Sequence, residues 1–238
     1  MKTAPYHCTQ SLLYVVVRKG WYSFLQHLSA FEGYRGYYNA AYAANALAAL
    51  DAAERLPDAQ ARYANTEVHR TELIALGKDC MAHWQSLKRY TATSFAADTC
   101  QARYDEAGAK YYIKARNNNW KAIQSMNVSA ANFIATHLAV LLAGNNMPAT
   151  FGAAYAATSA AFAAKFQQFI ASEEQAYNDT VAKATANNEV YNTLITMFKD
   201  GQELFKKTEG IRRQFVFDKV LAMLKNQPVP TTENQQQL

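Results

Sequence analysis

The residues best suited to bind a metal lie at helical spacing in the first half of the chain: His69, Glu72, Asp79 and His83. Residues three, four or seven apart on a helix share one edge, so these four side chains could point the same way. Di-iron bundles, however, use Glu-x-x-His pairs on two helices together with a glutamate from each of two more. Here the order is reversed, and no second expected helix repeats it. We therefore expect a solvated, ion-paired edge that binds no metal, with a metal site as the alternative.

The thiols and the remaining histidines supply no evident nucleophile. Cys80 shares a helical stripe with Trp84 and is expected to be buried as a small hydrophobic residue. The three cysteines are odd in number and lack C-x-x-C spacing, which argues against a disulfide framework or a zinc finger and favours a reducing compartment. His137 lies inside the apolar run of residues 134–143, where we expect a hydrogen-bonded core histidine.

Sequence motifs of known enzyme chemistry are absent from the chain. There is no G-x-x-x-x-G-K-[ST] or G-x-G-x-x-G phosphate loop, no G-x-S-x-G elbow and no H-E-x-x-H zinc motif. The carboxylate pairs Glu173-Glu174 and Asp105-Glu106 are adjacent in sequence, so on a helix their side chains point apart. We expect a protein that is not an enzyme and carries no cofactor.

The charge balance is moderately basic, with a net charge of +5 and a pI near 9.0. Lys110, Lys114 and Lys121 lie near aromatic residues, an arrangement that can grip phosphate and stack on bases. A second basic patch contains Lys206, Lys207, Arg212 and Arg213. Because no nucleic-acid-binding motif accompanies either patch, nucleic acid is not an expected partner.

The elements that carry these residues are expected to be helices throughout. Only 5 prolines and 9 glycines occur among 238 residues, too few for the turns of a β-sandwich. Apolar residues recur at spacings of three and four. This pattern predicts an all-α fold, an elongated antiparallel bundle of long amphipathic helices that forms a single domain over residues 1–225. The tail, residues 226–238, is expected to be disordered. Helices are expected over residues 10–31, 38–56, 58–90, 100–126, 129–144, 148–201 and 211–225.

The number of tyrosines is the feature that most favours a protein partner. There are 15 of them, and Tyr34, Tyr37, Tyr38 and Tyr42 cluster before and within the second expected helix. Tyrosine is enriched at protein interfaces because it combines apolar area with a polar group. We expect a structural or protein-interaction protein that self-associates through these four tyrosines, with another protein as an alternative partner.

Two further functions stay open beside self-association. The first is a membrane-active, pore-forming-like protein that releases an apolar hairpin over residues 130–164 onto a bilayer, although we expect this hairpin to stay packed. The second is a bundle with a metal or small-molecule site. Residues 12–17 are too short for a signal peptide, and residues 134–143 too short for a membrane span. A cytoplasmic location is expected, with export by a route without a cleavable signal as the alternative.

Overall fold

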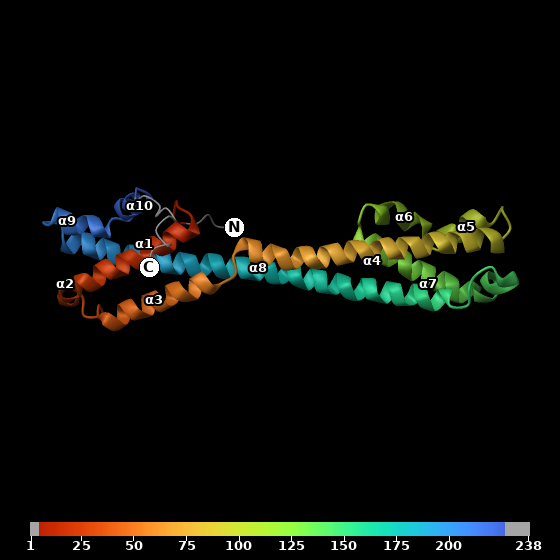
Figure 1. Ribbon diagram of the computed structural model, residues 1–238, viewed down its shortest axis with the longest axis horizontal. Helices are drawn as coiled ribbons and strands as arrows, with labels where there is room; N and C mark the ends of the chain where they lie inside the picture. The colour runs from red at the N-terminus through yellow and green to blue at the C-terminus, as the bar shows by residue number, and fades with distance from the viewer. Residues whose placement is uncertain (1–4, 227–238) are drawn as a thin grey trace, which may run out of the picture. The chain divides into compact units, whose positions relative to one another are not determined.

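The structure, a computed structural model, describes residues 5–226, and within this range every element is helical and no strand occurs (Figure 1). The predicted all-α fold with long helices is thereby confirmed. Apart from Asn226, the predicted tail at 226–238 lies outside the described residues. The elements in chain order are α1 (Gln10–Gln26), α2 (Leu28–Tyr34), α3 (Ala40–Arg55), α4 (Ala59–Ser94), α5 (Cys100–Glu106), α6 (Ala109–Arg116), α7 (Trp120–Leu142), η1 (Ala143–Asn145), α8 (Phe151–Leu204), α9 (Glu209–Arg212), η2 (Arg213–Phe215) and α10 (Phe217–Lys225).

The chain divides into two compact units. Unit 1 combines residues 1–58 with residues 178–238, and unit 2 consists of residues 59–177. Each unit has its own cluster of buried apolar side chains. The expectation of a single domain over residues 1–225 stays a prediction.

Unit 1 packs α1, α3 and the last part of α8 around an aromatic core, which α10 and η2 complete. The α8 segment runs parallel to α1, because Tyr14 bonds to Asn187 and Gly20 contacts Leu194. Lys183, near the start of that segment, bonds to the end of α3, so α3 runs in the opposite direction. The core is therefore enclosed by α1 and α8, which are parallel, and by α3, which is antiparallel to both.

Unit 2 packs α4 and α7 against the first part of α8, with α5 and α6 beside α7. Glu72 pairs with Lys165 and Cys80 approaches the carbonyl of Thr158, so α4 and α8 are antiparallel. The α4 stripe that contains Cys80 and Trp84 is buried as expected, and Leu73, Gly77 and Leu87 are buried with it. The apolar period of this helix therefore predicted its packing correctly.

The single helix expected over residues 100–126 is wrong. Gly108 interrupts it with a φ of 97°, and a Cβ there would lie 3.2 Å from the backbone of Met126, so the tight approach requires glycine. A second break occurs at residues 117–119, where the side chain of Asn119 caps α7 by accepting from Ala122 N. Ser129, expected to begin a helix, lies inside α7 instead.

The helix end expected at Gly201 is also wrong, because α8 continues to Leu204. Asn187 is buried, and its side-chain oxygen accepts from the Tyr14 hydroxyl at 2.8 Å. Gly201 lies against Phe215, whose ring occupies the space of a Cβ. Tertiary contacts thus stabilise helical residues that have poor helix propensity on their own.

Candidate functional site

The four tyrosines predicted as an interface lie in unit 1 at the corner between α2 and α3, called here the tyrosine corner (residues 34–42). The backbone turns there through a hydrogen bond from Tyr38 N to Arg35 O at 3.0 Å. Asn39 then caps α3 by accepting from Tyr42 N at 2.8 Å. The rings of Tyr37 and Tyr42 both contact that of Tyr38, with centroids 4.5 and 5.3 Å away. The sequence neighbours therefore form one aromatic cluster.

A buried carboxylate on α8 holds this corner in place. Asp200 accepts one hydrogen bond from Arg35 Nη2 at 2.9 Å and one from the Tyr38 hydroxyl at 2.6 Å, and its Oδ2 forms an ion pair with Arg35 Nε at 2.8 Å. Burial tends to raise the pKa of Asp200, but these hydrogen bonds and the charge of Arg35 outweigh it and leave that pKa below its ordinary value. Burial and the bond to Asp200 raise the pKa of Tyr38.

The four tyrosines differ in their exposure. Tyr38 is buried, with 1% of its surface exposed, so the predicted interface cannot include it as a contact residue. Tyr42 is half-buried, whereas Tyr34 and Tyr37 remain exposed, Tyr37 by 49%. The Arg35 guanidinium lies over the Tyr34 ring at 5.3 Å. The corner thus exposes two tyrosines, Tyr34 and Tyr37, beside Arg35.

The α4 edge that contains His69, Glu72, Asp79 and His83, for which a metal site was the alternative, makes other contacts. Glu72 forms an ion pair with Lys165 at 2.6 Å, which holds the pKa of Glu72 below its usual value. His83 donates from Nδ1 to the backbone carbonyl of Asp79 at 3.0 Å. His69 Nδ1 lies 3.8 Å from Glu72, too far for a hydrogen bond. Across residues 5–226, no three carboxylate, histidine or cysteine side chains converge as metal ligands do. The absence of a metal remains a prediction.

Cys80 and His137 lie where core residues were expected. The buried Cys80 sulfur accepts from Asn127 Nδ2 at 3.2 Å, and Asn127 in turn accepts from the Tyr155 hydroxyl at 3.0 Å. Burial raises the pKa of the Cys80 thiol, which makes it a poor nucleophile. His137 is half-buried, with Nε2 3.0 Å from a carboxylate oxygen of Glu106. Both residues therefore have structural partners.

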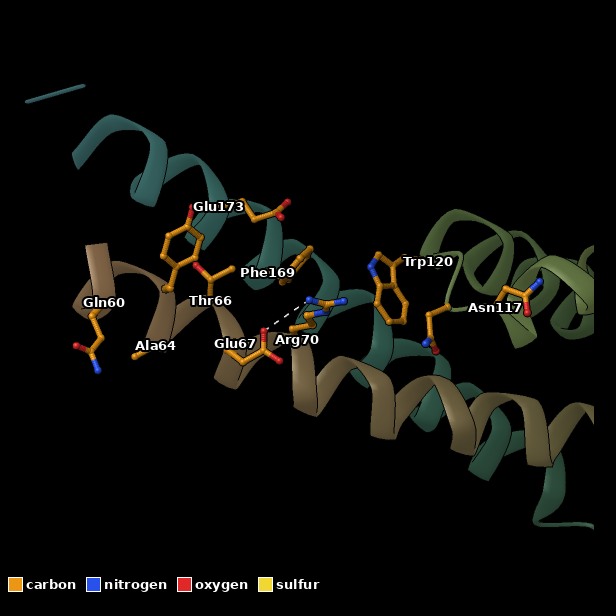
Figure 2. A pocket seen from close by; sticks show the side chains of 11 residues that line it. Gln60, Ala64, Thr66, Glu67, Arg70, Asn117, Trp120, Phe169 and Glu173 are labelled. Carbon is orange, nitrogen blue, oxygen red and sulfur yellow. Dashed lines mark ion pairs between the residues drawn. The ribbon is translucent and has the colours of Figure 1, made fainter. Parts of the chain in front are cut away.

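Unit 2 also has an open groove with a volume of about 1140 Å³. Figure 2 shows Arg70 from α4, Trp120 from α7 and Phe169 from α8 facing its opening. Arg70 pairs with Glu67 at 3.7 Å. No serine, cysteine or histidine lines the groove, so it holds no nucleophile–base pair of the usual kind. The full lining is Gln60, Tyr63, Ala64, Thr66, Glu67, Arg70, Asn117, Asn118, Trp120, Phe169 and Glu173.

A second surface of unit 2 is unusual because it carries no charge. Between Lys121 and Lys165 the sequence contains no Asp, Glu, Lys or Arg. This segment forms a helical hairpin, here called the uncharged hairpin (residues 122–164), made of α7, a turn and the start of α8. Several of its apolar residues are exposed, including Val128 at 58%. This absence of charge is visible in the sequence, although it is not a pattern of catalytic residues.

Helix α7 is also longer than the apolar run seen in the sequence. Among the described residues, the segment Trp120–Asn145 is long and apolar enough to cross a membrane, judged by length and composition alone. Only 33% of its most apolar window is buried within the structure. A core helix of a soluble protein passes the same test, but such a helix is mostly buried. The expectation that the chain has no membrane-spanning segment stays a prediction.

No protein-family model, no curated protein and no solved structure matches this chain. Its function is therefore inferred from the tyrosine corner, the groove and the uncharged hairpin.

Lys183 is, beside Asp200, a second buried charged residue that the sequence analysis did not predict. The Lys183 ammonium is buried in unit 1 and donates to the carbonyl oxygens of Ala53 at 2.7 Å and Leu56 at 2.8 Å. These acceptors lie at the C-terminal end of α3, where a cation is favoured by the helix dipole. Lys183 is thus a structural residue, and only its place on the apolar side of a long helix could have indicated its burial.

Proposed function

We propose that this chain is a non-catalytic interaction protein that self-associates through the tyrosine corner of unit 1. The observation that supports this function most directly is that Tyr34 and Tyr37 are exposed on a corner tied to the buried Asp200. The corner has no nucleophile or general base, so it suits contact and not catalysis.

The physical argument is one of preorganisation. Association costs free energy because loops and side chains lose freedom, by about 0.5–1.5 kcal/mol for each flexible side chain that is immobilised. Tyrosine has only two χ angles and loses little, and the turn that carries Tyr37 is already fixed by the Arg35–Asp200 pair. Most of the ordering cost is therefore met within the folded protein before a partner arrives.

A second copy of the chain fits this corner because the patch is self-complementary. Around a twofold axis the same residues face each other, so a patch must contain both halves of its favourable contacts. Arg35 supplies a cation and Tyr34 and Tyr37 supply ring faces, the two components of cation–π contacts. Tyrosine and arginine are also the residues most enriched at interface hot spots.

Light scattering of the purified protein at high micromolar concentration tests the proposal. The wild-type protein is expected to form oligomers, and Tyr34→Ser combined with Tyr37→Ser is expected to shift the mass towards the monomer. Helicity should stay unchanged because both side chains are exposed. Tyr38 is left intact because its removal would open the core.

The matched control is Tyr22→Ser, since Tyr22 is also an exposed tyrosine of unit 1, at 56%, but lies on α1 away from the corner. It should assemble like the wild type. A wild-type mass that stays monomeric at every concentration would refute self-association, and equal loss of assembly in the control would refute the role of the corner.

A further inference from the structure

The outward faces of the helices in unit 2 differ sharply in charge. Helix α4 exposes a charged surface typical of a helix in water, with Glu67, Arg70, Lys78, Asp79, Lys88 and Arg89 all exposed. In the uncharged hairpin the exposed positions are instead alanine, valine, leucine and neutral polar residues. Surface helices normally carry charge opposite their buried stripe, so this hairpin faces something other than bulk water alone.

The charge-free region ends at the same height on both helices of the hairpin. A Cβ built at Gly77 would contact Ile123, Phe162 and Trp120, which shows that the start of α7 and residue 162 of α8 lie beside one another. Lys121 and Lys165, the first charged residues on either side, each lie within a few residues of that level. The hairpin thus carries no charge from its turn to its opposite end. This end, with Trp120, Lys121 and Lys165, is called here the hairpin base.

Basic residues continue from this base onto α6. Lys110, Lys114 and Arg116 are exposed there, and α6 contains no acidic residue. Between them Ile113 is 74% exposed, an apolar side chain among cations. Helix α6 packs directly against α7. Basic residues beside exposed apolar ones are characteristic of helices that lie at the surface of anionic membranes.

The composition of the exposed face argues against a protein as its partner. Protein interfaces are enriched in aromatic residues, methionine and arginine, and depleted in alanine. The aromatic side chains of the hairpin are buried in unit 2: Phe133, Phe151, Tyr155 and Phe162. Its exposed face is rich in alanine, including Ala131, Ala135, Ala153, Ala156 and Ala160.

We propose that unit 2 binds lipid bilayers with anionic headgroups. The basic residues of α6 and Lys121 at the hairpin base contact the headgroups, whereas Lys165 stays paired with Glu72, and the exposed apolar side chains of the uncharged hairpin enter the boundary of the acyl chains. This contact does not require the core to open, because the residues involved are already exposed. It is independent of self-association through the tyrosine corner, which lies in unit 1.

Vesicle flotation tests this binding with the full-length protein. The wild type is expected to float with vesicles of phosphatidylcholine and phosphatidylserine, and less with phosphatidylcholine alone. The double variant Val128→Glu, Leu138→Glu is expected to bind at least about tenfold more weakly, because both positions are exposed on α7 and a carboxylate there must be dehydrated. Circular dichroism checks that helicity is retained.

Two single variants, Val68→Glu and Val15→Glu, and their combination serve as controls. Val68 is 55% exposed on α4 of the same unit, and Val15 is exposed on α1 of unit 1. Their combination changes the net charge as much as the hairpin variant, yet it should float like the wild type. A second pair, Lys110→Gln with Lys114→Gln, should reduce binding to the anionic vesicles only.

Three results would overturn the proposal. The first is a wild type that fails to float with anionic vesicles at low salt. The second is equal flotation of the hairpin variant and its charge-matched control, which would leave only nonspecific attraction of a basic protein. The third is an oligomer that forms without lipid and is dissociated by Val128→Glu. In that case the exposed face of the hairpin would be a contact with a second copy of the chain. A monomeric wild type that binds vesicles would refute the proposed function and leave this inference standing.

Discussion

The Tyr38 hydroxyl and the Asp200 carboxylate lie 2.6 Å apart, a short hydrogen bond between residues 162 positions apart in the sequence. Asp200→Asn replaces a charged acceptor by an amide and weakens the bonds to Tyr38 and Arg35. We expect the free energy of unfolding to fall by about 2 kcal/mol, typical of a lost hydrogen bond to a buried charged group. Denaturant titration measures it. Asp51→Asn removes a partly exposed ion pair with Arg18 and should cost less than about 1 kcal/mol.

The same carboxylate predicts a pH dependence of stability. Because the pKa of Asp200 is lowered in the folded state, its contribution is complete above the unfolded-state pKa of about 4 and disappears as the pH falls through the lower folded-state value. The stability difference between the wild type and Asp200→Asn should therefore be constant near neutral pH and shrink below about pH 4. Denaturant titrations across this range measure it, and a difference that grows on acidification would contradict the assignment.

Lys183 is predicted to stabilise the end of α3. Lys183→Met keeps a long side chain but leaves the carbonyl oxygens of Ala53 and Leu56 without the ammonium donor. We expect a loss of about 2–3 kcal/mol in the free energy of unfolding, because buried acceptors lose a charged partner. Lys199→Met, at an exposed position of α8, is the control and should be nearly neutral. Equal stability of both variants would show that water replaces the ammonium.

Gly20 permits close packing between α1 and α8. A Cβ there would lie 2.6 Å from Leu194 Cδ1 and 2.7 Å from Phe198 Cε1, both buried in the core. Gly20→Ala should therefore destabilise the protein by about 1–3 kcal/mol, despite the better helix propensity of alanine. Gly33→Ala, on α2 with open space around the glycine, should be neutral or stabilising. Thermal unfolding of the two variants separates the effect of core packing from that of helix propensity. Similar melting temperatures would contradict the close approach of α1 and α8 at Gly20.

The helical class and the packing face of α4 follow from the amino-acid pattern alone. Scarcity of proline and glycine together with a period of three to four residues is a local property, and local properties predict helices well. The same holds for the inward stripe that contains Cys80 and Trp84, which is buried as expected. The absence of charge between Lys121 and Lys165 was also visible in the sequence.

Contacts between distant segments determine which residues of a local pattern are buried or exposed and where a helix is interrupted. Tyr37 and Tyr38 are neighbours of the same type, yet a carboxylate far along the chain makes Tyr38 a core residue and leaves Tyr37 at the surface. Gly108 ends a helix because the backbone of α7 passes too close for a side chain, whereas Gly201 stays within α8 because Phe215 packs on it. These outcomes depend on contacts between segments distant in sequence, which the pattern within any one helix does not encode.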